Sequence, residues 1–188
     1  MTRSRSERGS ARNAAVIVGV VVIGLIAVLA TRKSAGERTQ RSPVVGRQAP
    51  EFSGKSVLDG TAFDLADQRG RYVLLNFFAP WCVPCQTEHA ELRAFKDAHA
   101  AAGDIAVVAL LFPPVELNDV KRFFSARGGD WPVIDNSRAI VDYGVTGIPE
   151  TFLIGPDGTV LWKTNGGVKA PKLERLLEEA KRAVGDSS

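Results

Sequence analysis

The stretch Tyr72–Cys85 reads YVLLNFFAPWCVPC. Its first seven residues are apolar except for Asn76, which is typical of a central strand buried on both faces. Two cysteines follow the strand, and Pro84 between them is suited to the first turn of a helix. The sequence therefore predicts a buried strand that turns into a helix, with a Cys-x-x-Cys pair at the turn.

The two cysteines are the only ones in the chain, so they do not belong to a wider framework of structural disulfides. Cys82 is expected at the N-terminus of the helix, where unpaired backbone amides and the helix dipole stabilise a thiolate. Cys85 lies one helical turn further on, within reach of a disulfide with Cys82. We therefore expect Cys82 to attack a client disulfide and Cys85 to resolve the mixed disulfide.

Pro84 has no backbone N–H that a Cys82 thiolate could accept from. With one donor fewer the thiolate is less stabilised, so the dithiol is expected to be a good reductant. We predict a reduction potential in the direction of thioredoxin, and a value near about −120 mV would contradict it.

A second apolar run at residues 105–112 follows a segment at 84–102 that has the apolar spacing of a helix. Strand, helix and strand in this order form a parallel crossover unit. The other expected elements are a hairpin of strands 56–58 and 62–65 around Asp59-Gly60-Thr61, a helix at 117–127, a strand at 131–134, a helix at 137–143, an antiparallel pair at 151–154 and 160–164, and a closing helix with Pro171 in its first turn. The predicted fold class is α/β, a mixed central sheet with helices on both faces.

Residues 14–30 form an unbroken run of 17 apolar residues and glycines, about the length of a short transmembrane helix. Arginines precede the run, which favours a cytoplasmic N-terminus and an extracytoplasmic domain. Arg32 and Lys33 disfavour cleavage after Ala30, so we expect a single-pass anchor in the cell membrane, with a cleaved signal peptide as the alternative. The expected organisation is a basic segment (1–13), the anchor (14–30), a linker (31–45) and a globular domain (46–184).

The net charge of +3 is distributed unevenly along the chain. Residues 1–42 hold eight Lys and Arg against two Glu, a charge of +6, so the remaining residues carry −3. The excess of positive charge is thus a property of the N-terminal segment. It gives no support for nucleic-acid binding.

Three motifs resemble those of a known family. NFFAPWCVPC resembles the active-site strand and turn of thioredoxin-like proteins. YGVTGIPETFLI at Tyr143–Ile154 resembles the cis-proline loop and following strand of the TlpA/ResA/CcmG-type extracytoplasmic thiol–disulfide oxidoreductases, and GRQAPEF resembles the start of their domain. The resemblance covers residues 46–184 and implies a thioredoxin-like fold.

By this resemblance Pro149 is cis, Ile148 lies beside the disulfide, and the backbone there pairs with a client chain. The alternative for Pro149 is an ordinary proline at the start of a strand. Glu150 becomes a candidate for a client-side or pKa-tuning group, and Trp81 for a hydrophobic shield. Val83 stands where the ResA-like branch has a glutamate, so the branch stays open.

Glu88 is the candidate for a proton relay. It follows Cys85 by three residues and precedes Leu92 by four, which places it on the helix face that carries Cys85. A carboxylate there can take the Cys85 proton during resolution. Thioredoxins carry a buried aspartate at the position that Asn76 occupies here. Since asparagine cannot titrate, the resemblance implies that Glu88 takes over the role of the proton relay. A solvated glutamate is the alternative.

The leading interpretation is an exported disulfide reductase that keeps client thiols reduced. By resemblance the client is apocytochrome c, and the electrons come from a membrane thiol transporter. We expect a monomer whose redox group is the Cys82–Cys85 disulfide, with no cofactor, haem or metal.

Two other classes of function remain open. A peroxiredoxin-like peroxidase would have Thr or Ser at the position of Ala79, three residues before Cys82. A copper-transfer chaperone or a zinc site would need a histidine beside the cysteines, and His89 follows Cys85 by four residues. We expect His89 at the surface and His99 in a structural role.

Overall fold

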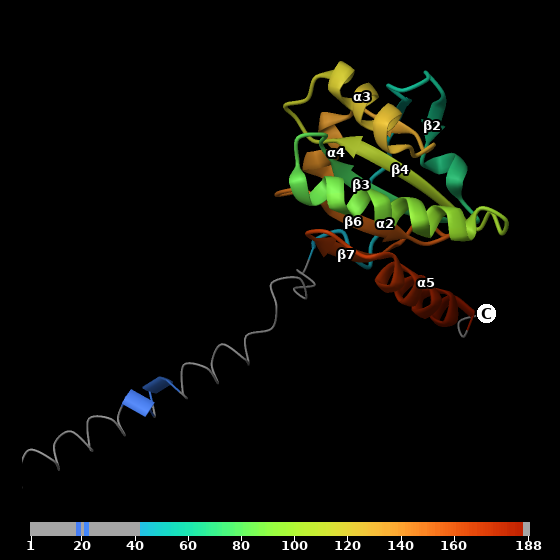
Figure 1. Ribbon diagram of the computed structural model, residues 1–188. Coiled ribbons are helices and arrows are strands. Elements are labelled where there is room, and N and C mark those ends of the chain that lie inside the picture. Colours follow the sequence, from blue (N-terminus) through green and yellow to red (C-terminus); the bar gives the residue numbers. More distant parts are fainter. Residues whose placement is uncertain (1–17, 20, 23–41, 186–188) are drawn as a thin grey trace, which may run out of the picture. The chain divides into compact units, whose positions relative to one another are not determined.

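Figure 1 shows the protein as a computed structural model, in which residues 18–19, 21–22 and 42–185 are described. Most of the expected anchor at 14–30 lies outside the described residues. The parts of it that are described are helical. Across the described ranges, no helix has both the length and the apolar character needed to cross a membrane.

The chain divides into two compact units, of which the second, residues 38–188, holds a five-stranded sheet in the order β5-β4-β3-β6-β7. β3 pairs in parallel with β4 and β4 with β5, whereas β6 is antiparallel to both β3 and β7. The sheet is therefore mixed, as predicted. The elements are β1 (Ser53–Lys55), β2 (Ala62–Asp64), η2 (Ala66–Gln68), β3 (Tyr72–Phe78), α2 (Val83–His99), β4 (Ile105–Leu111), α3 (Leu117–Arg127), β5 (Val133–Ile134), α4 (Ser137–Asp142), β6 (Glu150–Ile154), β7 (Val160–Asn165) and α5 (Ala170–Gly185).

The crossover unit β3–α2–β4 places the cysteine pair. The two strands are in register from Tyr72 opposite Ile105 to Phe78 opposite Leu111. All seven residues of β3 are buried, as the apolar run predicted. Because parallel strands end at the same edge of a sheet, α2 begins at the edge where β3 and β4 both end.

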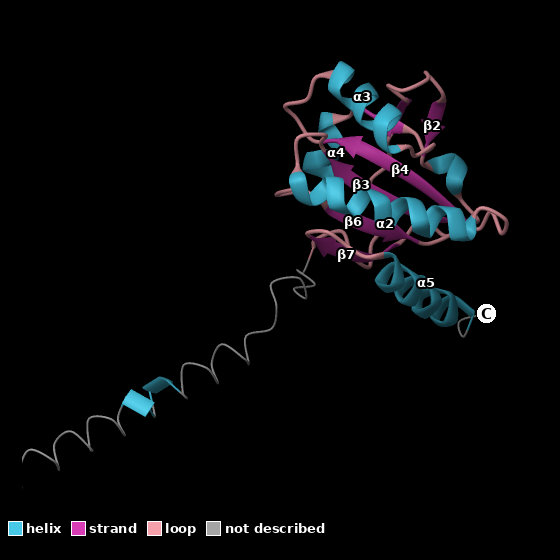
Figure 2. Ribbon diagram, in the orientation of Figure 1, coloured by secondary structure: helices cyan, strands magenta, loops and turns pink. Residues whose placement is uncertain are grey.

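Helices cover both faces of the sheet (Figure 2). Side chains of α2, α3 and α5 pack on one face, and α4 packs on the other together with residues of the β1–β2 hairpin. Neighbouring residues of β3 alternate between the two clusters, with Leu74 in the first and Val73 in the second. The first cluster includes Leu92, Phe95, Phe123, Phe124, Leu173 and Leu177, and the second includes Phe52, Phe63, Ala139, Tyr143 and Phe152.

The predicted hairpin is present, but its first strand was placed wrongly: β1 is Ser53–Lys55 and not 56–58. The Ser56 amide donates to the Thr61 carbonyl (2.8 Å), and the Gly60 amide donates to the Ser56 carbonyl (2.8 Å). The residues from Ser56 onwards therefore form the turn. Gly60 has a φ of +80°, a conformation that glycine adopts without strain.

α2 ends at His99, three residues before the predicted end. The Gly103 amide donates to the His99 carbonyl (3.0 Å), which turns the chain toward Ile105 at the start of β4. α3 has the predicted bounds and is followed by Gly128, whose φ is +73°.

Residues that precede Gly46, the expected first residue of the domain, already pack against it. Ser42 and Val44 are buried, and the Gly46 amide donates to the Val160 carbonyl (2.8 Å). Val44 belongs to the second cluster, so the last residues of the expected linker pack on the domain.

His89 is buried, which corrects the expectation of a surface histidine; its exposed fraction is 4%. Its Nε2 bonds to the Gly128 carbonyl (2.8 Å), so this nitrogen carries the proton. The rings of Phe123, Phe124 and Trp131 have centroids 4.8 to 5.1 Å from the imidazole. Burial lowers the pKa of His89, because a charged imidazole would lose its hydration there. Its role is to join α2 to α3.

Replacing His89 with Leu is expected to change how stability depends on pH. A histidine whose pKa is lower in the folded than in the unfolded protein binds fewer protons when the protein is folded. Its contribution to the free energy of unfolding is therefore lost as the pH falls below about 6.5, at no more than about 1.4 kcal/mol per pH unit. Urea unfolding at pH 7.5 and 5.5 should show a larger loss in the wild type than in the variant. Equal losses in the two proteins would contradict this account.

Candidate active site

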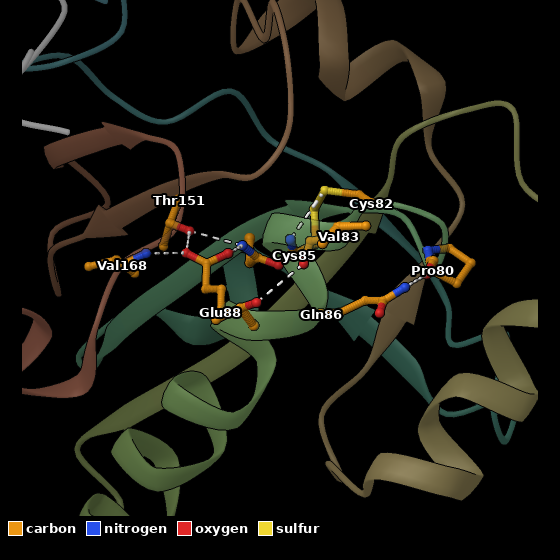
Figure 3. The surroundings of a disulfide bond; sticks show 10 residues. Pro80, Cys82, Val83, Cys85, Gln86, Glu88, Thr151 and Val168 are labelled. Atoms are coloured by element: carbon orange, nitrogen blue, oxygen red, sulfur yellow. Dashed lines mark hydrogen bonds between the residues drawn. A yellow bond between two sulfur atoms is a disulfide. The ribbon is translucent and has the colours of Figure 1, made fainter. Parts of the chain in front are cut away.

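The Cys82–Cys85 disulfide lies at the start of α2 (Figure 3), with a Cα–Cα distance of 5.2 Å. Cys82 is the N-cap residue, and its Sγ accepts a hydrogen bond from the Cys85 amide at 3.2 Å. The cysteines are thus at the helix N-terminus that the sequence predicted. Both are buried, while Val83 between them is exposed.

Trp81 forms one wall beside the pair. Its indole is about half exposed, and its Nε1 donates to the Pro114 carbonyl at 2.7 Å. A shallow hollow of about 320 Å³ lies between this indole and α3, lined by Pro80, Trp81, Asp119, Arg122 and Phe123. The side chain is therefore held in place directly before Cys82 in the chain, and its role as a shield stays a prediction.

The loop before β6 forms a second wall. The Ile148–Pro149 bond is cis, as the resemblance implied. The Pro149 carbonyl accepts from the Gly166 amide (2.8 Å), and Ile148 packs against the cluster that contains both cysteines. Among the described residues, the backbone amide and carbonyl of Ile148 have no hydrogen-bond partner. They are available to an extended chain that docks on the loop.

Glu88 is buried one turn after Cys85 (Figure 3), so the alternative of a solvated glutamate is wrong. Its carboxylate accepts from Asn76 Nδ2 (3.0 Å), Thr151 Oγ1 (3.1 Å) and the Val168 amide (3.1 Å). Desolvation raises the pKa of Glu88 to about 7, against the lowering effect of these three donors. A carboxyl with this pKa can both take and release a proton near neutral pH.

A cavity of about 240 Å³ reaches Glu88 from the start of α5, lined by Pro84, Thr87, Glu88, Glu91, Gly167, Val168 and Lys169. Glu91 lies at this cavity and accepts from the Ala170 amide at the first residue of α5 (3.0 Å). The cavity therefore lies against the side chain of buried Glu88.

Glu150 lies away from Glu88. Successive residues of a strand point to opposite faces, and Thr151, which binds Glu88, follows Glu150 directly. The Glu150 carboxylate is fully buried on the other face, 2.8 Å from Lys163 Nζ. The sheet therefore separates it from Glu88, and it does not face a client.

Sequence reasoning missed several residues that shape the site, among them Thr151, Lys163, Pro114 and the backbone of Val168. Lys163 gave the clearest signal, because it is a lysine inside the strand predicted at 160–164. The other three act through contacts between distant parts of the chain.

Three observations bear on the other functions considered. His89, the histidine nearest the pair in sequence, uses Nε2 to bond to Gly128. Within the part of the chain that the structure describes, no three side chains of His, Cys, Asp or Glu are grouped to hold a metal. Ala79, which replaces the peroxidase hydroxyl, is buried.

Comparisons with known proteins agree with this geometry. The family model described as Redoxin matches residues 44–177. The thiol:disulfide interchange protein CycY of Rhizobium leguminosarum bv. viciae is 35% identical over 121 residues, and the match covers 62% of each protein, less than two thirds of CycY. The thiol-disulfide oxidoreductase ResA of Bacillus thuringiensis (strain Al Hakam) is 32% identical over 137 residues, 72% of this chain and 78% of that protein.

A solved structure shows the same fold. The crystal structure of a thioredoxin family thiol:disulfide interchange protein from Chlorobium tepidum TLS aligns with a TM-score of 0.64 and 31% identity, over 71% of this chain and 94% of that one. With a family match over most of its length and the Cys82–Cys85 disulfide at the helix start, this chain belongs to the redoxin family of thioredoxin-like thiol–disulfide oxidoreductases.

Proposed function

We propose that this chain is a disulfide reductase anchored at the outer face of the cytoplasmic membrane, where it keeps the thiols of apocytochrome c reduced for haem attachment. The observation that carries the proposal is the cysteine pair at the start of α2, beside the unpaired backbone of Ile148 and one turn from buried Glu88. Together they supply a nucleophile, a docking edge and a proton acceptor.

The reaction consists of two exchanges. The Cys82 thiolate attacks a client disulfide, so that one client sulfur bonds to Cys82 and the other leaves and takes a proton. Glu88 then takes the proton of Cys85, and the Cys85 thiolate attacks Cys82 Sγ. The client leaves as a dithiol, two electrons have moved to it, and the Cys82–Cys85 disulfide is formed. A membrane thiol transporter returns the pair to the dithiol.

The direction of transfer follows from Pro84, which removes one N–H at the helix start. The Cys85 amide, 3.2 Å from Cys82 Sγ, still stabilises a thiolate there, so the pair is reactive without being a strong oxidant. The apolar run at 14–30 supports the anchor, and the names of CycY and ResA support thiol–disulfide exchange. The active form is a monomer that binds neither nucleic acid nor a cofactor.

Replacing Cys85 with Ala in cells tests the proposal. The variant keeps the attacking Cys82 but cannot resolve the mixed disulfide, so it should accumulate covalently bound clients, with apocytochromes c among them. The complexes would be captured on the tagged protein without reductant, released with reductant and identified by mass spectrometry. A variant that lacks both cysteines is the matched control.

Recovery of apocytochromes with the Cys85→Ala chain and not with the control would support the client assignment. A trap that stays empty while the cells are producing c-type cytochromes would contradict it. Recovery of other disulfide-bonded proteins alone would keep the reductase and exclude this client.

A further inference from the structure

Glu150 and Lys163 form an ion pair inside the domain. Their exposed fractions are 1% and 3%, and Lys163 Nζ lies 2.8 Å from Glu150 Oε2. Lys163 on β7 is directly opposite Phe152 on β6, and its Nζ lies 5.2 Å above the centre of that ring. The ammonium is thus held between a carboxylate and an aromatic face.

The second oxygen of Glu150 holds the loop that precedes β6. Glu150 Oε1 accepts from the Thr146 amide (3.2 Å) and from Thr146 Oγ1 (3.3 Å). Thr146 lies on the surface two residues before Ile148, whose backbone is unpaired. A continuous series of contacts therefore runs from Lys163 through Glu150 and Thr146 to the client-docking edge.

The loop is otherwise held at its two ends. The Val145 amide donates to the Ile140 carbonyl (2.9 Å), and the Pro149 carbonyl accepts from Gly166. Between these two points, the Thr146 amide donates to the Glu150 carboxylate, which is its acceptor among the described residues. Replacing a buried ion pair by apolar side chains of similar volume is often neutral for stability. Since apolar side chains could give the same stability, the specific contribution of this pair is to fix the position of the loop.

We infer that Lys163 is a positioning residue for client docking: by fixing Glu150, it holds the loop of Thr146 and Ile148 where an extended polypeptide can pair with the Ile148 backbone. This inference rests on the proposed function, since it concerns how a polypeptide client binds. It gives Glu150 a role through Thr146 in place of the client-side or pKa-tuning role that the resemblance implied. The chemistry at Cys82 and Cys85 does not depend on the pair.

The test compares a polypeptide client with a small disulfide. The client is a peptide with an oxidised Cys-x-x-Cys-His segment, and the small disulfide is 2-hydroxyethyl disulfide, which has no peptide backbone to pair with the loop. Pre-reduced Lys163→Met should react with the peptide about 10- to 100-fold more slowly than the wild type and with 2-hydroxyethyl disulfide at an unchanged rate. The reduction potential should also stay unchanged.

Two variants separate positioning from loss of stability. The double variant Lys163→Met with Glu150→Leu replaces the pair by apolar side chains, so folding is expected to recover while Thr146 stays unheld. It should remain slow with the peptide. Leu177→Ala, a core substitution in α5 that is remote from the loop in the chain, should lower stability and leave the ratio of the two rates unchanged.

Amide hydrogen exchange provides a readout that needs no client. Exchange at Thr146 should be faster in both Lys163 variants and unchanged in Leu177→Ala. Equal slowing of the peptide and 2-hydroxyethyl disulfide reactions, a double variant with the wild-type peptide rate, or unchanged exchange at Thr146 would each overturn the inference. If the wild type reduces 2-hydroxyethyl disulfide and not the peptide, the proposed function fails, and the exchange data alone decide whether Lys163 positions the loop.

Discussion

Replacing Cys82 with Ser is expected to abolish disulfide exchange, with a loss on the order of 10³-fold or more in rate, because the attacking thiolate is removed. Replacing Cys85 with Ser should have a different effect. Cys82 then still attacks once, and each protein molecule ends in a stable mixed disulfide with its client. The difference follows from the helix start, where Cys82 is the N-cap residue and its Sγ accepts from the Cys85 amide.

The measurement is a single-turnover reaction of each reduced variant with the oxidised Cys-x-x-Cys-His peptide, quenched with acid and analysed by mass spectrometry. Cys85→Ser should give a one-to-one adduct at close to the wild-type rate of the first step, and Cys82→Ser should give none. The reverse pattern, with an adduct only in Cys82→Ser, would show that the two roles are exchanged.

Local patterns in the sequence were sufficient for the elements that carry the cysteines. The continuous apolar run of β3 defined a strand buried on both faces, and the bounds of α3 followed from an amphipathic segment that ends at Gly128. The C-terminal end of α2 was placed wrongly because the alanines after His99 favour a helix, whereas the path to β4 requires a turn there. Intrinsic propensity is a weak guide where tertiary structure sets the path.

The environment of a side chain was harder to predict than its place on an element. The helical spacing put Glu88 on the correct face of α2, but its donors come from Asn76, Thr151 and Val168, which are 12, 63 and 80 residues away. His89 was assigned to the surface for the same reason, since the rings that bury it belong to α3 and to Trp131. Burial by distant segments leaves no local periodicity in the sequence.

Replacing Glu88 with Gln is expected to slow the resolving step by about 10²-fold at pH 7, because an amide cannot take the Cys85 proton. The first attack by Cys82 should keep its rate. With the peptide as client, the mixed disulfide should therefore persist in the variant and decay at once in the wild type. Glu91→Gln is the matched control, since Glu91 lies one turn further along α2, where its side chain caps α5 and an amide oxygen can still do so.

The pH dependence of the two rates adds a second comparison. In the wild type the rate of the resolving step should increase as the pH rises through about 7, because Glu88 loses its proton there and can take that of Cys85. In Glu88→Gln this increase should be absent. Equal lifetimes of the mixed disulfide in the wild type and Glu88→Gln, with the same pH profile, would remove Glu88 from the mechanism.

The raised pKa of Glu88 also predicts how the oxidised protein loses stability as the pH rises. Because the pKa of this carboxyl is about 7 in the folded protein and has its ordinary value of 4.5 in the unfolded chain, the folded state binds more protons between these values. The free energy of unfolding should therefore fall through this window, by about 3 kcal/mol in total for this one group. The free energy of unfolding would be measured in urea at pH 5 and at pH 8. Its change from pH 5 to pH 8 should be more negative in the wild type and in Glu91→Gln than in Glu88→Gln by about that amount, because the amide has no proton to lose and the other groups, His89 included, contribute equally in all three proteins.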